Sequence, residues 1–219
     1  MKIYAMSDIH GCLDAFQNEL SLVDLDDNNN MLILCGDYIH RGYDSYGVVE
    51  KIMELKKKYK KRVIVLMGNH EESAMDYGAI VEDYSVNEEY DEKRDKKCLD
   101  FISHLELYYK YKDEVVFCHA GVDEEAGEYW EDGTSDYYYT GKYPAETGPF
   151  CINIVAGHIS ASAVANDSKH KGIYYDGDSH YFIDGCTEKS GYVPVLMYDT
   201  QEKKFYEVIE SGNEELNNY

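Results

Sequence analysis

Gly36-Asp37-Tyr38-Ile39-His40-Arg41-Gly42 is the stretch from which the fold of this chain can be worked out. It follows the apolar run Met31–Cys35, which has the length and composition of a buried strand, and a helical pattern begins near Asp44. A carboxylate, an imidazole and a guanidinium therefore lie on the loop at the carboxyl end of a strand, where open α/β sheets bind ligands. Taken alone, the stretch is equally consistent with a polar turn between two glycines.

Four further strand patterns end in the same way. Short apolar runs at 2–6, 62–67, 114–118 and 151–156 each lead at once into side chains of the kind that bind metal ions. Ligand sites in α/β sheets form where strand exits of this kind meet, so these side chains are expected to gather at one place. The five exits carry Asp8 with His10, Asp37, Asn69 with His70, His119, and His158.

Strand and helix patterns alternate over 219 residues without a linker, which predicts an α/β protein with a single domain, 1–219. Two segments depart from this alternation. The charged stretch at about 72–112 is predicted to be a helical insertion. The Tyr-rich acidic stretch at about 124–149, which contains the only tryptophan, is predicted to be a long loop or lid over the site, or else a self-packed surface excursion.

The chain carries 43 acidic against 21 basic side chains, a net charge of −22. This field repels nucleic acid and anionic membranes, whose binding requires a basic surface. No apolar run approaches the roughly 18 residues of a membrane span. Met1 leads directly into a strand pattern rather than an export signal, so a cytoplasmic protein is expected. The six cysteines show no CxxC spacing and are expected to be buried, reduced thiols rather than disulfides or a zinc site.

The predicted ligand set consists of carboxylates, imidazoles and a carboxamide. Such a set suits manganese, iron, zinc, cobalt or nickel rather than ions that prefer thiolates. Two cations about 3.5–4 Å apart share one ligand, usually a carboxylate, and Asp37 is the central candidate. Two such cations would also supply the local positive charge that an acidic protein needs in order to bind a phosphorylated substrate.

The motifs occur in an order that resembles the calcineurin-like metallophosphoesterases. They are Asp8-x-His10, Gly36-Asp37-x-x-x-Arg41-Gly42, Gly68-Asn69-His70-Glu71, His119-Ala120-Gly121 and Gly157-His158. The chain is most similar to the phosphoprotein phosphatase branch, with its bacterial serine/threonine phosphatase and diadenosine tetraphosphatase relatives. The resemblance runs from residue 3 to about residue 199. It implies two mixed β-sheets packed face to face with flanking helices.

The resemblance also implies two divalent metal ions, manganese first, and a role for each motif residue. The implied ligands are Asp8 and His10 for the first ion, Asp37 as the bridge, and Asn69, His119 and His158 for the second. His70 would be the general acid near the leaving group, and Arg41 would contact the phosphoryl oxygens. A hydroxide bridging the two ions would attack phosphorus directly, without a covalent enzyme intermediate.

Two positions depart from the family pattern. The family usually has an aspartate where this chain has His40, and that carboxylate orients the catalytic histidine and favours its protonated form. His40 carries no negative charge, so His70 is expected to be a weaker acid and the enzyme to favour aryl phosphates such as phosphotyrosine. The protein phosphatases also use an arginine between the two late histidines, where this chain offers only Lys142 as a basic residue.

Three functions are compatible with these residues. The first is a phosphatase acting on a phosphorylated protein or peptide, or on a small phosphoester. The second is a nucleotide hydrolase of the diadenosine tetraphosphatase type, for which the Tyr-rich segment offers stacking surfaces. The third is a binding protein on a catalytically decayed scaffold, suggested by His40 and the missing arginine. The physiological substrate and the oligomeric state are left open.

Overall fold

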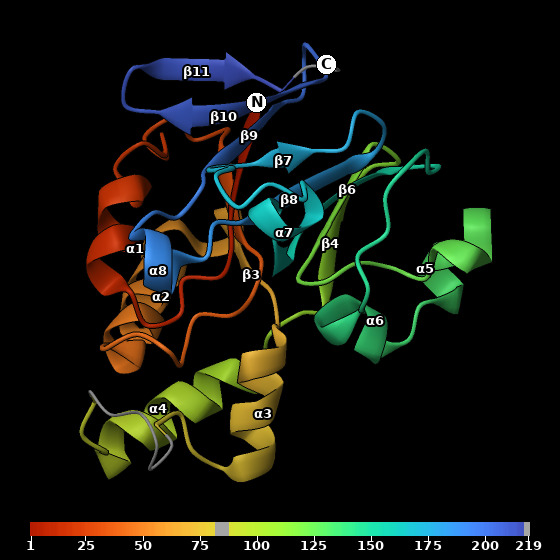
Figure 1. Ribbon diagram of the computed structural model, residues 1–219. Coiled ribbons are helices and arrows are strands. Elements are labelled where there is room, and N and C mark those ends of the chain that lie inside the picture. Colours follow the sequence, from red (N-terminus) through yellow and green to blue (C-terminus); the bar gives the residue numbers. More distant parts are fainter. Residues whose placement is uncertain (82–87, 217–219) are drawn as a thin grey trace.

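Two mixed β-sheets lie face to face with helices on the outside in the computed structural model, which describes residues 1–81 and 88–216 (Figure 1). The predicted fold class is therefore confirmed. The strands are β1 (Lys2–Met6), β2 (Met31–Leu34), β3 (Val63–Val65), β4 (Tyr108–Tyr111), β5 (Val115–Cys118), β6 (Asn153–Ser160), β7 (Tyr174–Tyr175), β8 (His180–Asp184), β9 (Leu196–Asp199), β10 (Lys204–Ile209) and β11 (Gly212–Glu215). The helices are α1 (Leu13–Leu20), α2 (Ser45–Tyr59), η1 (Lys60–Arg62), α3 (Asn69–Tyr77), α4 (Glu92–Ile102), η2 (Glu124–Tyr129), α5 (Trp130–Gly133), α6 (Asp136–Gly141), α7 (Ala161–Val164) and α8 (Thr187–Ser190).

The first sheet has the strand order β11-β10-β9-β1-β2-β3. β1, β2 and β3 run parallel, with Ile3 opposite Met31 and Leu32 opposite Val63, whereas β9, β10 and β11 are antiparallel to their neighbours. Parallel neighbours need a crossover connection, which α1 and α2 supply here. The exits of β1, β2 and β3 consequently lie at one edge of the sheet.

The second sheet has the order β4-β5-β6-β8-β7. Its central strands β5, β6 and β8 are parallel, and β4 and β7 pair antiparallel at its two edges. The exits of β5 and β6 therefore also share an edge. The two sets of exits meet at the same end of the sandwich, which is where the candidate site lies.

The central strands of both sheets are buried on both faces, because alternate side chains point into the core between the sheets and into the layer outside it. In β1, Ile3 and Ala5 face the core between the sheets, whereas Tyr4 and Met6 face the helices. In β5, Phe117 lies in the core between the sheets, whereas the other face of the strand packs under the Tyr-rich segment. Strands that are buried on both faces read as continuous apolar runs, which is how they stood out in the sequence.

The predicted helical insertion at 72–112 is only partly helical. It contains most of α3 and all of α4, but its last part, Tyr108–Tyr111, is strand β4 at the edge of the second sheet. Residues 82–87 of the insertion lie outside the described residues. Helix α4 ends at Ile102. The apolar residues beyond it lie within the predicted helical stretch, but they lead into β4 instead. Tyrosines on both faces of this short strand have apolar partners, which favours strand over helix.

The Tyr-rich segment at 124–149 is folded into short helices rather than a long loop. Trp130 and Tyr139 are buried against β5 and β6, and the ring of Tyr139 stacks on that of Tyr108 with centroids 4.7 Å apart. Tyr129 and Tyr137 point outward and are exposed. The prediction of a long loop is therefore wrong for residues 124–141, where a few large aromatic side chains fasten the segment to the sheet. Its role as a lid stays a prediction.

The cysteines and the helices bear on two further expectations. All six cysteines are free thiols, and four of them are buried, but Cys151 is exposed and Cys186 is half-buried. The expectation that every thiol is buried is therefore wrong for these two. Among residues 1–81 and 88–216, no helix combines the length and apolar composition needed to cross a bilayer.

Candidate metal centre

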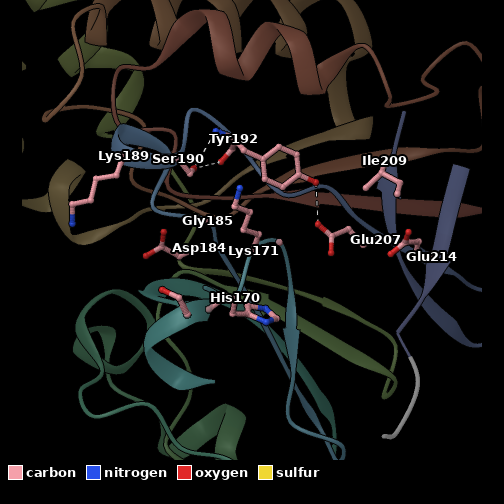
Figure 2. Close-up of a pocket in the computed structure, with 13 residues that line it drawn as sticks. His170, Lys171, Asp184, Gly185, Lys189, Ser190, Tyr192, Glu207, Ile209 and Glu214 are labelled. Atoms are coloured by element: carbon pink, nitrogen blue, oxygen red, sulfur yellow. Dashed lines mark hydrogen bonds between the residues drawn. The ribbon is translucent and has the colours of Figure 1, made fainter. Parts of the chain in front are cut away.

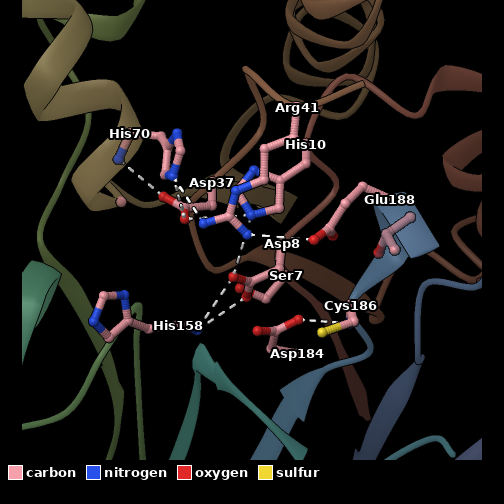
Figure 3. A network of polar contacts seen from close by, with 12 residues as sticks. Ser7, Asp8, His10, Asp37, Arg41, His70, His158, Asp184, Cys186 and Glu188 are labelled. Atoms are coloured by element: carbon pink, nitrogen blue, oxygen red, sulfur yellow. Dashed lines mark hydrogen bonds and ion pairs between the residues drawn. The ribbon is translucent and has the colours of Figure 1, made fainter. Parts of the chain in front are cut away.

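The structure brings all the predicted ligand residues together at one end of the two sheets. Asp8 and His10 follow β1, Asp37 follows β2, and His119 follows β5. Figure 3 shows side chains from several of these elements converging on one point. We refer to this set as the metal centre, defined by Asp8, His10, Asp37, Asn69, His119 and His158.

Two of the strand exits differ from the prediction. Asn69 and His70 are not on a loop but in the first turn of α3, which begins directly after Gly68. His158 lies within β6, because that strand continues to Ser160 after a shift in its register with β8. The strand continues through the Gly157-His158 pair, which the sequence pattern did not indicate.

The backbone is strained at the site itself. Asp8, His10, Asp37, Arg41 and His158 all have positive φ, between 49° and 65°, and so does His40 at 67°. Residues other than glycine seldom adopt this conformation, which costs of order 1–3 kcal/mol at each position and tends to occur at functional sites. Two glycines permit the close packing: a Cβ on Gly157 would collide with the Asp8 carboxylate, and one on Gly68 would collide with Asp37.

Asp37 presents its two carboxylate oxygens to different histidines. Its Oδ2 is 3.6 Å from Nε2 of His10, and its Oδ1 is 3.4 Å from Nε2 of His119. The side chain is 2 % exposed, and the backbone N–H of His70 donates to Oδ1 at 3.0 Å. A carboxylate that faces two ligand groups in this way has the geometry needed to bridge two cations.

The ring orientations of His10 and His119 suit metal binding. Nδ1 of His10 is 3.1 Å from the Ile39 carbonyl, and Nδ1 of His119 is 2.8 Å from the Cys35 carbonyl. A carbonyl only accepts, so a neutral ring places its proton on Nδ1 and leaves the Nε2 lone pair free, as in most metal-binding histidines. Nε2 of His10 is buried and has no hydrogen-bond partner among the described residues. This buried, unpartnered acceptor fits a metal ligand.

The second ligand set is equally close. Oδ1 of Asn69 lies 3.1 Å from Nε2 of His119 and 2.9 Å from Nδ1 of His158. Atoms bound to one cation at about 2.0–2.2 Å are roughly 3 to 3.5 Å from one another, so these spacings fit a common ion. Asp8 is set for the first ion: its Oδ1 is 3.9 Å from Nε2 of His10, and its carboxylate accepts the backbone N–H of His158 at 3.1 Å. The residues present therefore fit two divalent cations.

The pKa shifts show that burial disfavours the charged forms of the ligand side chains at this site. Burial raises the pKa of Asp8 well above its usual range, and the charges of Asp184 and Asp37 raise it further. Burial likewise raises the pKa of Asp37 to about 7. Burial lowers the pKa of His10 to about 2 and that of His158 to about 4. Buried carboxylates and neutral imidazoles of this kind are what a bound cation would stabilise.

His70 lies between His40 and Arg41. Its Nδ1 is 2.8 Å from Nδ1 of His40, and its Nε2 is 3.2 Å from Nη2 of Arg41. A guanidinium only donates, so Nε2 of His70 accepts, and a neutral His70 carries its proton on Nδ1 and donates it to His40. Burial, followed by the charge of Arg41, lowers the pKa of His70 to about 3. His70 Nε2 is also 3.9 Å from Asp37 Oδ2, so by distance alone His70 groups with His10 and Asp37.

Glu71 supports the centre from behind. Its two carboxylate oxygens accept the backbone N–H groups of Asp37 at 2.7 Å, Tyr38 at 2.8 Å and Gly68 at 3.1 Å. The residue is fully buried, and burial raises its pKa to about 7. Glu71 thereby fixes the loop that carries Asp37 relative to the start of α3, which carries Asn69.

Two acidic residues from the second half of the chain complete the surroundings. Asp184, at the end of β8, accepts the backbone N–H of Cys186 at 2.7 Å, and its charge raises the pKa of both Asp8 and Asp37. It therefore caps a turn and also faces the centre. Glu188 on α8 lies 3.6 Å from Arg41. No sequence pattern pointed to Glu188, because its four-residue helix lies far along the chain from every motif.

The other basic residues of interest are committed elsewhere. Arg62 donates to the carbonyls of Leu25 and Asn30, and Arg94 pairs with Glu50 at 2.9 Å. Lys142, the only basic residue between the two late histidines, is buried and donates to Val122 and two glutamates. Arg41 is thus the one arginine of the chain at the metal centre.

Asp184 also lines a cavity of about 670 Å³ (Figure 2). The cavity shares Asp184 with the polar network of Figure 3 and is lined by groups of both charges, including Lys171, Lys189 and Glu207. On its far side Glu207 accepts hydrogen bonds from Tyr192 at 2.9 Å and from the Ile173 backbone at 3.1 Å. The cavity offers polar contacts to whatever extends beyond the metal centre.

Comparison with known proteins gives relatives that match part of the chain. A symmetrical bis(5'-nucleosyl)-tetraphosphatase of Wigglesworthia glossinidia brevipalpis is 38% identical over 71 residues, which are 32% of this chain and 25% of the relative. One of Buchnera aphidicola subsp. Acyrthosiphon pisum is 29% identical over 130 residues, 57% of this chain and 46% of the relative. The matched part of the chain thus spans a quarter to just under half of these relatives.

A structural match and a family model cover more of the chain than these relatives do. A solved structure of a cold-active protein-tyrosine phosphatase from a psychrophilic Shewanella species superposes with a TM-score of 0.70 at 18% identity, covering 99% of this chain and 80% of that one. The sequence model of the calcineurin-like phosphoesterases matches residues 1–197, which include every residue of the metal centre. The chain therefore belongs to the calcineurin-like phosphoesterase family.

Proposed function

We propose that this chain is a phosphatase that depends on two divalent cations and hydrolyses phosphomonoesters. The observation that carries the proposal is the split of the Asp37 carboxylate between His10 on one side and His119 on the other. Asp8, His10 and Asp37 would hold one cation, and Asp37, Asn69, His119 and His158 the other. When bound, such a pair activates water at neutral pH and offsets the charge of the phosphoryl group.

The chain's own residues bind and orient the substrate. The Arg41 guanidinium lies within hydrogen-bond distance of His70 and beside the Asp37 and Asp8 carboxylates (Figure 3), so it is placed to contact phosphoryl oxygens. His70 would give a proton from Nε2 to the leaving oxygen. For that, Arg41 must release the Nε2 atom and the ring must first take up a proton there, because the neutral ring carries its proton on Nδ1. Glu71 and the backbone N–H of His70 keep Asp37 in position during turnover. The cavity beside Asp184 would accept the part of the substrate beyond the phosphoryl group.

We further propose that the substrate carries a leaving group that needs little protonation. His70 has an imidazole, that of His40, at 2.8 Å, where a carboxylate would favour the imidazolium form of His70. A phenol has a pKa of about 10, far below that of an aliphatic alcohol, so phosphotyrosine depends less on a general acid than phosphoserine does. The full-length structural match to a protein-tyrosine phosphatase is consistent with this preference.

The substitution His40→Asp tests this preference with phosphotyrosine and phosphoserine peptides. The new carboxylate should raise the proton affinity of His70, so the ratio of kcat/KM should move toward phosphoserine by about tenfold. His104→Asp, the same substitution at an exposed histidine, is the matched control and should leave the ratio unchanged. A ratio that stays put in both variants would contradict the role given to His40.

A second candidate is hydrolysis of dinucleoside tetraphosphates, which the names of the most similar relatives favour. Its leaving group, a nucleoside diphosphate, is also a weak base, so it satisfies the same argument about His70. Assays of the manganese-loaded protein on diadenosine tetraphosphate, phosphotyrosine peptide and p-nitrophenyl phosphate separate the two. A kcat/KM at least tenfold higher on the dinucleotide would replace the first proposal by the second. A metal-loaded protein inert on all three would favour a binding protein instead.

A further inference from the structure

Arg41 has two partners in the structure, and they lie on opposite sides of its guanidinium (Figure 3). Nη2 is 3.2 Å from Nε2 of His70, and Nη1 is 3.6 Å from Oε1 of Glu188. The Arg41 side chain is 47% exposed and therefore has room to move. A long side chain held in one geometry loses about 2 kcal/mol of rotamer entropy, so its position depends on such partners.

Glu188 is not an ordinary surface carboxylate. Its side chain is only 15% exposed, and its Oε2 is buried and accepts no hydrogen bond from the described residues. The other cation near it is Lys189, at 3.8 Å, whose side chain is 78% exposed. A largely buried carboxylate with an unsatisfied oxygen is costly to maintain without a charge partner. Of its two cationic neighbours, Arg41 has the less exposed side chain.

The place of Glu188 is fixed by the turn that follows β8. The Asp184 carboxylate accepts the backbone N–H of Cys186, and Cys186 has a positive φ of 50°. The chain then enters α8 with Glu188 in its first turn. Glu188 is thus anchored to the same sheet edge that carries Asp184, on the opposite side of the centre from His70.

We propose that Glu188 is a positioning residue for Arg41. It holds the guanidinium at the edge of the metal centre, between His70 and α8, so that the remaining N–H groups of Arg41 face the phosphoryl oxygens. The proposal rests on the proposed phosphatase function. It matters in this chain because the other two arginines are committed elsewhere, so Arg41 is the sole source of a bidentate phosphate contact.

A direct electrostatic effect of Glu188 on the phosphate would have the opposite sign, so the direction of the measured change distinguishes the two mechanisms. A carboxylate at the rim of a phosphate site repels a dianion directly, and removing its charge would then tighten binding. If Glu188 acts by positioning Arg41, removing its charge weakens binding instead. The two mechanisms therefore predict opposite changes in the affinity for inorganic phosphate.

The experiment is a double-mutant cycle of Glu188→Gln and Arg41→Gln in the zinc-loaded protein. Glu188→Gln should raise the Kd for inorganic phosphate and the KM for p-nitrophenyl phosphate about fivefold, with kcat changed less than twofold. In the Arg41→Gln background the same substitution should have no further effect on phosphate binding. Glu54→Gln is the matched control, since Glu54 pairs with Lys51 at the same 3.6 Å distance. This control should behave as wild type.

A second readout needs no catalysis. The chain has only three arginines, so their Nε–H resonances can be resolved by NMR, and the ¹H–¹⁵N heteronuclear NOE of Arg41 should fall in Glu188→Gln. Arg62 and Arg94 serve as internal references and should not change. Tighter phosphate binding in Glu188→Gln, an equal effect with and without Arg41, or an unchanged Arg41 NOE would overturn the proposal. A wild-type protein that binds metal but hydrolyses no phosphoester would overturn the proposed function, while the NOE would still report on Glu188.

Discussion

Two buried polar clusters in this molecule are built from the same kinds of side chain and behave in opposite ways. One is the metal centre. The other, which we call the Glu124 network, consists of Glu124, Lys142, Glu146, Asp176 and His180 and joins the Tyr-rich segment to the second sheet. In the network every charge faces an opposite one: Glu124 lies 2.6 Å from Lys142 and 3.1 Å from His180, and His180 lies 2.9 Å from Asp176.

The pKa shifts of the two clusters have opposite signs. In the Glu124 network burial opposes ionisation, but hydrogen bonds from His180 and Lys142 outweigh it and lower the pKa of Glu124 to about 2. The pKa of His180 is raised, since Glu124 and Asp176 outweigh the burial of its ring. In the metal centre burial prevails, so the pKa of Asp37 rises and that of His10 falls. The network is complete within the chain, whereas the metal centre needs charge from outside it.

The largest expected effect comes from removing the shared carboxylate. Asp37→Asn should lower kcat/KM on p-nitrophenyl phosphate about a thousandfold, because two cations together contribute several kcal/mol to the transition state. Metal content should fall below two ions per chain. The metal-free variant should unfold at a temperature no lower than metal-free wild type, because the burial of the lost carboxylate outweighs its interaction with Arg41 there. A clear loss of metal-free stability would show that Asp37 has a structural role and would weaken the comparison.

The Glu124 network should respond in the reverse manner. Glu124→Gln should lower the free energy of unfolding by about 3 kcal/mol, because Lys142 and His180 lose a buried partner. It should leave metal content at two ions per chain. Glu146→Gln removes a more exposed partner of Lys142, 46% exposed, and should cost less than about 1 kcal/mol. Urea unfolding measures both, and equal losses for the two variants would contradict the assignment of Glu124 as the centre of the network.

These two variants also mark what the sequence could and could not predict. Asp37, Asn69 and His119 were predictable because apolar strands are legible and each is followed at once by a ligand residue. The Glu124 network was not, since Lys142 and His180 are 38 positions apart in the chain, by their residue numbers, and are joined through Glu124, which contacts both. Sequence alone placed Lys142 in a loop and suggested no partner for it.

The remaining errors have similar physical causes. Tyr108–Tyr111 is a short strand whose pairing with β5 decides its conformation, so local propensity did not identify it. His158 lies inside a strand because β6 continues past the shift in its register with β8. Glu188 was missed because it reaches the metal centre from a short helix with no motif. For His158 and Glu188 the deciding contact joins residues distant in the chain, which a reading of local patterns does not contain, whereas β4 was missed although its partner β5 is its neighbour in the chain, with Tyr111 opposite Val115.

The smallest expected effect is a pH dependence carried by His180. Its pKa is raised in the folded chain, so it stabilises the fold fully below its unfolded pKa of about 6.5, and this contribution is lost as pH rises through the folded value. The gap in unfolding free energy between wild type and His180→Gln should therefore narrow from pH 6 to pH 9. Urea unfolding at four pH values measures the gap. A gap that widens with pH would mean that His180 is neutral in the folded chain.

The central claim is that the metal centre binds two divalent cations with Asp37 between them. Metal analysis of the protein, dialysed against manganese and then against metal-free buffer, tests it most directly. The account predicts two manganese ions per wild-type chain, fewer than two in Asp37→Asn, and two in Glu124→Gln. One ion or none in the wild-type chain would contradict it.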